Sequence, residues 1–240
     1  MTAPLRSTQP DTPQEAQIQP GLLLSNRLRN LFDLGLDLLF PPRCAGCNRV
    51  DTVWCATCQA EIDLVDFPAP TSPGTESALD FIAATGPHKG KLQQAIWSLK
   101  FENERKLAAI LAQRLNNRLN TLNWTIDMVV GVPLHTNRLQ ERGYNQSQLM
   151  AQELASLQGL PIVTDAIIRR IDTRSQVGLD AVQRQENMQN AFVARQDLVH
   201  DKTILLIDDV YTTGATLKAC AAAALDAGAA AVYGLTLTMA

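Results

Sequence analysis

From residue 79 onward, the chain alternates between short apolar runs and longer segments with the period of a helix. The apolar runs are bounded by polar or turn-forming residues and predict strands over residues 81–85, 127–132, 166–171, 202–210 and 231–237. The longer segments predict helices over residues 88–101, 104–122, 145–158 and 216–228. Because helices of this length separate the strands, the pattern predicts an α/β fold, with a mostly parallel sheet and helices on both faces.

The residues before this domain show a different pattern and predict four separate segments. Residues 1–20 are rich in Pro, Gln and Thr, which predicts a disordered tail. Leucines near helical spacing predict an amphipathic helix over 21–40, and we expect its apolar face to dock on the protein itself rather than on a membrane surface. A Pro-, Ser- and Thr-rich linker over 63–78 then separates a cysteine-rich knuckle, 41–62, from the domain at 79–240.

Composition and charge narrow the classes of function. No apolar run approaches the roughly 20 residues of a spanning helix, so we expect no transmembrane segment. No export signal is visible at the N-terminus, which predicts a cytoplasmic protein. The net charge is −3, so a nucleic acid would have to meet a local patch. Residues 81–142 are the one basic segment, with nine Lys and Arg against four acids, although most such runs are solvated helix faces.

Four of the five cysteines form two C-x-x-C pairs, Cys44 with Cys47 and Cys55 with Cys58. Two such pairs close together offer four thiolates to one Zn²⁺ ion, and a four-cysteine site leaves no position for water. The pattern therefore predicts one structural zinc. Disulfides are the alternative, which a reducing compartment disfavours. Cys220 stands alone in an alanine-rich segment, and we expect it to be a packed thiol.

The most informative stretch runs from Ile204 to Thr216. A fully apolar strand leads into Asp208 and Asp209, then into a turn rich in Thr and Gly, then into a helix. Backbone amides at a helix N-terminus favour an anion, and paired carboxylates beside them can accept hydrogen bonds from a diol. This combination favours a sugar phosphate over a bare phosphate. Its position outside the strand ends is where α/β sheets bind ligands.

This stretch, LLIDDVYTTGAT, resembles the phosphoribosyl pyrophosphate (PRPP) signature of type I phosphoribosyltransferases. Four other features narrow the resemblance to the ComF family of competence proteins. They are the four-cysteine knuckle, LKFENERKLA at 99–108, VPLHTNRLQERGYNQ at 132–146, and the stretch from Arg170 to Phe192. Together the matching segments extend over nearly all of the chain outside the tail.

The resemblance implies roles for individual residues. Asp208 and Asp209 would hold the ribose hydroxyls of PRPP, which binds with magnesium. The 5′-phosphate would be wrapped by Thr212, Thr213, Gly214, Ala215 and Thr216. The pyrophosphate side would comprise Pro133, Leu134, His135, Arg138 and Arg142, although the two arginines could equally form ion pairs at a helix N-terminus. A flexible loop closing over PRPP would include Arg174, Gln176, Arg184 and Asn187.

Three functions agree with these features. The first is a ComF-like factor of DNA uptake and natural transformation that binds single-stranded DNA and works with other DNA-uptake proteins. The second is an active phosphoribosyltransferase on an unidentified acceptor; purine-salvage relatives carry an Asp base where this chain has Thr212. The third is a non-catalytic PRPP- or nucleotide-sensing partner protein. For DNA, we expect the basic residues of 89–142 to converge with Arg169, Arg170 and Arg174.

Stacking on bases would have few candidates, because the chain contains only three Trp, three Tyr and six Phe residues. Trp97 and Tyr144 lie near basic residues in the sequence and are the two candidates. We nevertheless expect both rings to pack in the core, so that electrostatics would supply most of the affinity for DNA.

Overall fold

The structure is a computed structural model that describes residues 41–74, 77–171 and 191–240. The predicted tail over 1–20, the predicted helix over 21–40 and the predicted loop with Arg174, Gln176, Arg184 and Asn187 lie outside the described residues. All described helices and strands belong to one compact unit, Arg43–Ala240.

A parallel four-stranded sheet forms the centre of this unit. Its strands are β1 (Phe81–Ala84), β2 (Met128–Gly131), β5 (Thr203–Tyr211) and β6 (Ala231–Met239), in the order β1-β6-β5-β2. All three pairings are parallel. The apolar runs of β5 and β2 are buried on both faces, as a sheet covered by helices requires.

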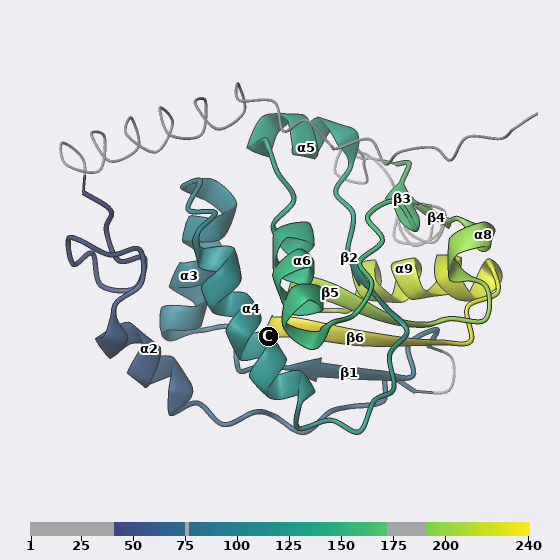
Figure 1. The fold of residues 1–240 in the computed structure, drawn as a ribbon, viewed down its shortest axis with the longest axis horizontal. Coiled ribbons are helices and arrows are strands. Elements are labelled where there is room, and N and C mark those ends of the chain that lie inside the picture. Colours follow the sequence, from purple (N-terminus) through teal and green to yellow (C-terminus); the bar gives the residue numbers. More distant parts are fainter. Residues whose placement is uncertain (1–40, 75–76, 172–190) are drawn as a thin grey trace, which may run out of the picture. The chain divides into compact units, whose positions relative to one another are not determined.

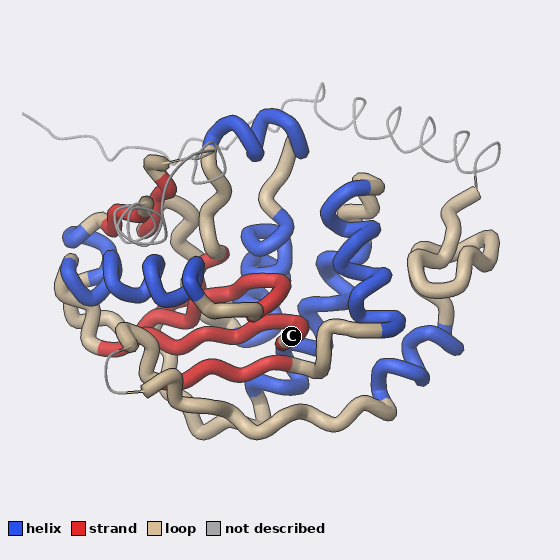
Figure 2. Tube along the Cα trace, turned by 180° about the vertical axis from the view of Figure 1, so that it is seen from behind, coloured by secondary structure: helices blue, strands red, loops and turns tan. Residues whose placement is uncertain are grey.

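Helices cover both faces of the sheet, which confirms the predicted α/β class (Figure 1). One face carries α4 (Leu107–Leu119) and α6 (Gln146–Gln158), with α3 (Gly90–Phe101) beside α4. The opposite face carries α9 (Ala215–Asp226), which lies in front of the strands in Figure 2. The predicted start of α6 is also confirmed, since the Asn145 side chain accepts hydrogen bonds from the backbone N–H groups of Ser147 and Gln148.

One predicted strand does not join the main sheet. Residues 166–171 form only the short β3 (Ile167–Arg169), which pairs antiparallel with β4 (Phe192–Ala194) in a separate two-stranded sheet. The physical reason is that Ile167 and Phe192 bury their side chains in the cluster around α9, while Ile168 faces outward. Short helices α2 (Ala56–Asp63), α5 (Thr136–Arg142) and α8 (Gln196–Val199) complete the described elements. No helix in the described ranges has the length and apolar character needed to cross a membrane.

Two buried arginines of α4 bind the segment that follows α2. Arg114 donates to the carbonyl oxygens of Val65 (2.9 Å) and Thr85 (2.6 Å), and Arg118 donates to that of Pro68. Both guanidinium groups also lie over the ring of Phe67, at 5.1 and 5.4 Å from its centroid. These contacts fix residues 65–68 against α4 and so connect the cysteine knuckle to the sheet.

Candidate sugar-phosphate site and cysteine cluster

Two adjacent acids near the carboxyl end of β5 form the centre of the site. Asp209 is buried, and each of its oxygens accepts a hydrogen bond: Lys100 Nζ donates to Oδ1 and Gln146 Nε2 to Oδ2, both at 2.7 Å. Asp208 accepts from the hydroxyl of Ser147 at 2.9 Å and from the backbone N–H of Asp209. The first turn of α6 and the end of α3 therefore hold both carboxylates in fixed positions.

Burial, and to a smaller extent the neighbouring charge of Asp209, raise the pKa of Asp208 to about 7. The hydrogen bonds from the Asp209 amide and from Ser147, together with the charge of Lys100, oppose that rise. A carboxyl with this pKa changes its protonation state near neutral pH, so the charge of the site is sensitive to a bound cation or anion.

The turn between β5 and α9 depends on a glycine. Gly214 has φ 76°, in the left-handed region, and directly precedes α9. A Cβ atom at this position would lie 2.5 Å from the ring of Tyr211, so a side chain is excluded by space as well as by conformation. Thr212 and Thr213 are exposed beside it. The turn thus presents hydroxyl groups and backbone amides at the N-terminus of a twelve-residue helix.

The two acids open into a cavity of about 390 Å³. Residues predicted for the site that line this cavity are Pro133, Leu134, Arg138, Arg142, Asp208, Asp209 and Thr216. His135 is not among its lining residues; its ring Nδ1 instead accepts from the backbone N–H of Asn137 at the start of α5. Thr212, Thr213, Gly214 and Ala215 also do not line it.

Four cysteine sulfurs gather at the knuckle, as the two C-x-x-C pairs predict. The Sγ atoms of Cys44, Cys47, Cys55 and Cys58 all lie within 4.8 Å of one another. The Cys44–Cys58 distance is 3.7 Å and the Cys47–Cys55 distance is 3.6 Å. A tetrahedral zinc with Zn–S bonds of ~2.3 Å places its sulfurs about 3.8 Å apart, so the four donors fit such an ion.

The knuckle backbone also favours a thiolate at one of these positions. The backbone N–H of Cys58 donates to the sulfur of Cys55, which lowers the pKa of Cys55 to about 6. The thiolate is the form that binds a metal. Lys91 of α3 donates to the carbonyl oxygen of Gly46, and this bond ties the knuckle to the α/β domain.

Residues 100–237 match the phosphoribosyl transferase domain family, more than half of the chain. The chain belongs to that family. Among relatives, competence protein F of Haemophilus influenzae is 29% identical over 73% of this chain and 80% of its own length. DNA utilization protein YhgH of Escherichia coli K12 is 30% identical over 79% of this chain and 85% of its own. This phosphoribosyltransferase-domain protein is therefore a homologue of these competence and DNA utilization proteins, which confirms the ComF resemblance.

Solved structures show only a weak likeness. Glutamine PRPP amidotransferase from B. subtilis, complexed with ADP and GMP, covers 55% of this chain and 25% of that chain, with 21% identity and a TM-score of 0.38.

Several residues of the sugar-phosphate site were not assigned to it from the sequence. Lys100, Phe101 and Gln146 line the cavity of this phosphoribosyltransferase-domain protein, and Ser147 lies behind it on Asp208. Three of them stood within the two segments that carried the family resemblance, 99–108 and 132–146. A signal was therefore present, but nothing in the sequence pairs residue 100 with residue 209.

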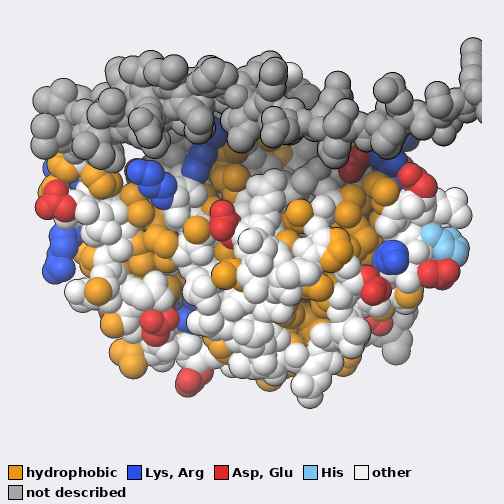
Figure 3. Space-filling model, in the orientation of Figure 1, with side chains coloured by type: hydrophobic (Ala, Val, Ile, Leu, Met, Phe, Trp, Pro, Cys, Tyr) orange, Lys and Arg blue, Asp and Glu red, His pale blue; other side chains and the backbone are white. Residues whose placement is uncertain are grey.

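The expected convergence of the basic residues is only partial. Lys89, Lys91, Arg105, Lys106 and Arg170 do not line the cavity. Lys100, Arg138 and Arg142 line it together with Arg169 of β3. Arg114 and Arg118 do not join them, because both are buried among backbone carbonyls. The face seen in Figure 3 accordingly shows separate basic patches among apolar and uncharged atoms.

The two aromatic candidates also differ. The prediction of a core position is confirmed for Tyr144, which is buried and donates its hydroxyl to the Leu99 carbonyl oxygen. It is wrong for Trp97, whose ring is 58% exposed. The reason is that α3 buries the face carrying Ile96 and Leu99, and Trp97 points away from it.

Proposed function

We propose that this ComF-family protein binds PRPP, or a closely related sugar phosphate, together with Mg²⁺, and acts in DNA uptake and natural transformation. The observation that carries the proposal is the carboxylate pair Asp208–Asp209 beside the Thr/Gly turn, opening into a cavity with four basic side chains. Two carboxylates suit the ribose diol and a cation. Lys100, Arg138, Arg142 and Arg169 suit the phosphate groups.

The donor types of the cavity and of the turn next to it fit the two ends of such a ligand. The hydroxyl and amide groups of the turn would bind the 5′-phosphate, while Arg138 and Arg142 of α5 would bind the diphosphate. Mg²⁺ prefers oxygen ligands and commonly binds through substrate phosphates with one or two carboxylates. When bound, it would neutralise charge on the diphosphate.

Calorimetry with PRPP and Mg²⁺ tests this proposal. The wild-type protein should bind PRPP, and the Asp208→Ala/Asp209→Ala variant should lose at least tenfold in affinity. Asp226→Ala is the matched control, since Asp226 is an exposed acid at the end of α9 and should leave binding unchanged. Equal affinity in the wild type and the double variant would place the ligand elsewhere.

Transfer to an acceptor and PRPP sensing are the alternatives for the same pocket. Incubation of the protein with PRPP, Mg²⁺ and a panel of amines and nucleobases separates them, with pyrophosphate release as the measurement. Release that depends on one acceptor and disappears in the double variant would establish a transferase. PRPP binding without release for any acceptor would favour the binding role.

We also propose that the four-cysteine cluster holds one structural zinc ion and that the protein works in the reducing cytoplasm. Four unbridged thiols at tetrahedral spacing support both statements. Elemental analysis should find one zinc per chain in the wild type and none in Cys44→Ser/Cys58→Ser. Cys220→Ala, which removes the one thiol outside the cluster, should retain the metal; a metal-free folded wild type would refute the site.

Single-stranded DNA is the second candidate ligand. The cationic group Lys100, Arg138, Arg142 and Arg169 provides the charge for a phosphodiester backbone, and the exposed Trp97 provides a ring for a base. Other proteins of DNA uptake are the partners that this role requires. A salt titration with a fluorescent oligonucleotide tests it: Arg138→Ala/Arg142→Ala should weaken binding and flatten the salt dependence. An unchanged slope in this variant would contradict the proposed patch.

A further inference from the structure

A second cavity lies against the sugar-phosphate cavity and shares one wall with it. It has a volume of about 420 Å³, and its shared wall consists of Lys100, Phe101, Arg138 and Arg142. Asn103, Glu141 and Tyr144 line this second cavity alone. We call it the annex. Among the residues of the proposed PRPP site, Asp208, Asp209 and Thr216 line the first cavity and not the annex, whereas Arg138 and Arg142 line both.

Three cationic side chains and one acidic side chain line the annex: Lys100, Arg138 and Arg142, and Glu141. Arg138 makes no hydrogen bond or ion pair with any residue in the described part of the chain, although it is half-buried. Arg142 follows it by four positions. Burial lowers the Arg142 pKa and the charge of Arg138 adds to the effect, whereas the charges of Asp209, Tyr144 and Glu141 oppose it. Like charges at this spacing repel. A bound anion would relieve that repulsion and pair with Arg138.

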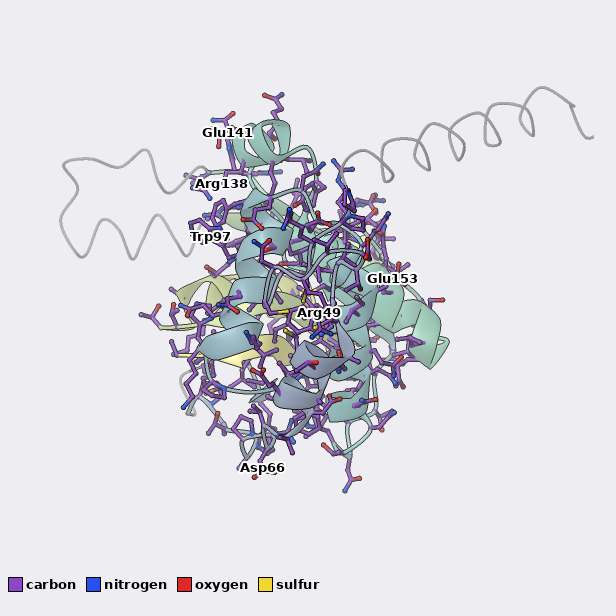
Figure 4. All side chains as sticks on the ribbon, turned by 90° about the vertical axis from the view of Figure 1, so that its left-hand side faces the viewer. Arg49, Asp66, Trp97, Arg138, Glu141 and Glu153 are labelled. Atoms are coloured by element: carbon purple, nitrogen blue, oxygen red, sulfur yellow. The ribbon has the colours of Figure 1, made fainter. Side chains whose placement is uncertain are left out.

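The annex also carries exposed aromatic surface. Phe101 is 59% exposed, and its ring centroid lies 4.5 Å from that of Trp97. The guanidinium of Arg142 lies 5.4 Å from the centroid of Phe101. Figure 4 shows Trp97 and Arg138 on the same side of the described unit, from α3 and α5. Planar rings beside the cation of Arg138 suit a planar base that carries a phosphate.

We propose that the annex binds the base and phosphate of a nucleotide, beside the ligand of the sugar-phosphate cavity. The base would stack on Phe101, whose ring lies against that of Trp97, and the phosphate would pair with Arg138. Such a unit has two sources, a free nucleoside monophosphate or the phosphorylated 5′ end of a single strand. This site goes beyond the PRPP proposal, because it predicts a second ligand in a space that Asn103, Glu141 and Tyr144 line and that the two acids and Thr216 do not. Its strand-end form rests on the proposed binding of single-stranded DNA.

Titration with dTMP in the absence of PRPP tests the site, with calorimetry as the measurement. Phe101→Leu keeps the apolar bulk and removes the ring, and it should weaken dTMP binding at least about fivefold, the loss expected for one stacked base. Phe81→Leu is the matched control, since Phe81 is an exposed ring on β1 and should leave dTMP affinity unchanged. Equal affinity in Phe101→Leu and wild type would overturn the proposal.

Two oligonucleotides of one sequence identify the source. If a 5′-phosphorylated strand binds at least about tenfold more tightly than its 5′-hydroxyl form, and Phe101→Leu removes the difference, the annex binds a strand end. If dTMP binds through Phe101 and the two strands are equal, the annex binds free nucleotides. If neither dTMP nor the phosphorylated strand binds, the proposal fails. Because these titrations contain no PRPP, their failure is separate from failure of the PRPP proposal.

Discussion

Lys100 Nζ lies 2.7 Å from Asp209 Oδ1, although 109 positions separate the two residues in the sequence. Lys100 comes from the end of α3 and Asp209 from β5, so the ion pair forms only when these two elements meet. The Asp209 carboxylate is buried beside a second acid, Asp208. The lysine therefore supplies a positive charge directly beside a buried carboxylate.

Replacing this lysine should destabilise the fold. In Lys100→Met, the buried Asp209 carboxylate loses its cation, and we expect the free energy of unfolding to fall by about 2 kcal/mol. Urea unfolding measures the change. Lys89→Met is the control, since Lys89 is an exposed lysine just before α3 and should change stability by less than about 0.5 kcal/mol. Equal losses in both variants would contradict the role of the ion pair.

The raised pKa of Asp208 predicts a dependence of stability on pH. Its pKa is 3.8 in the reference state and about 7 in the fold, so the folded protein holds this proton more tightly than the unfolded chain. This tighter binding of the proton stabilises the folded state. The effect is fully present below about pH 4 and is lost as pH rises through about 7. Because Asp208 loses this proton between about pH 5 and about pH 8, the wild type should lose about 2.5 kcal/mol of stability over that interval.

Asp208→Asn separates this effect from those of other groups. The amide keeps the shape of the carboxyl but does not titrate, so the loss of stability between the two pH values should shrink by that amount. Urea unfolding of both proteins at each pH measures it. If the two proteins lost the same stability over this interval, Asp208 would not be the titrating group.

Alanine substitutions at two glycines separate two destabilising effects, the strain of a positive φ and the steric clash of a new Cβ atom. Gly214 and Gly159 have φ of 76° and 66°, so Ala is strained at both. Only at Gly214 would the new Cβ meet a neighbour, the Tyr211 ring at 2.5 Å, while the space at Gly159 is open. We expect Gly159→Ala to cost about 1 kcal/mol and Gly214→Ala to cost more and to abolish PRPP binding as well. Urea unfolding measures the loss of stability, and calorimetry measures PRPP binding. Equal stability losses and equal PRPP affinities in the two variants would show that the turn does not depend on the space beside Tyr211.

The buried arginines of α4 should affect stability and not DNA. Arg114→Met leaves the carbonyl oxygens of Thr85 and Val65 without a donor, and we expect a loss of about 2–3 kcal/mol. Because Arg114 is buried, the salt slope of oligonucleotide binding should stay as in the wild type. Arg138→Ala should instead lower that slope by about 0.7, the value for one phosphate contact on a single strand. A lower slope in folded Arg114→Met would show that this side chain reaches DNA.

The main elements of the fold could be read from the sequence because they depend on local pattern. The run before Asp208 is apolar at every position, which only a strand buried on both faces requires. Asn145 begins α6 through its own side chain, an interaction that spans three residues. The short β3 was placed in the wrong sheet, because an apolar run shows that a strand is buried but not which partner it pairs with.

The sequence by itself determined the types of chemistry present: the acids after β5, the Thr/Gly turn and the two C-x-x-C pairs, all of which are contiguous or nearly so. Only the tertiary structure decided which basic residues face the site. Arg114 and Arg138 belong to the same basic segment, yet Arg114 binds buried carbonyls and Arg138 lines two cavities. The reason is physical: charge is a property of a residue, whereas burial and ion pairing depend on elements far apart in the chain, as Lys100 and Asp209 show.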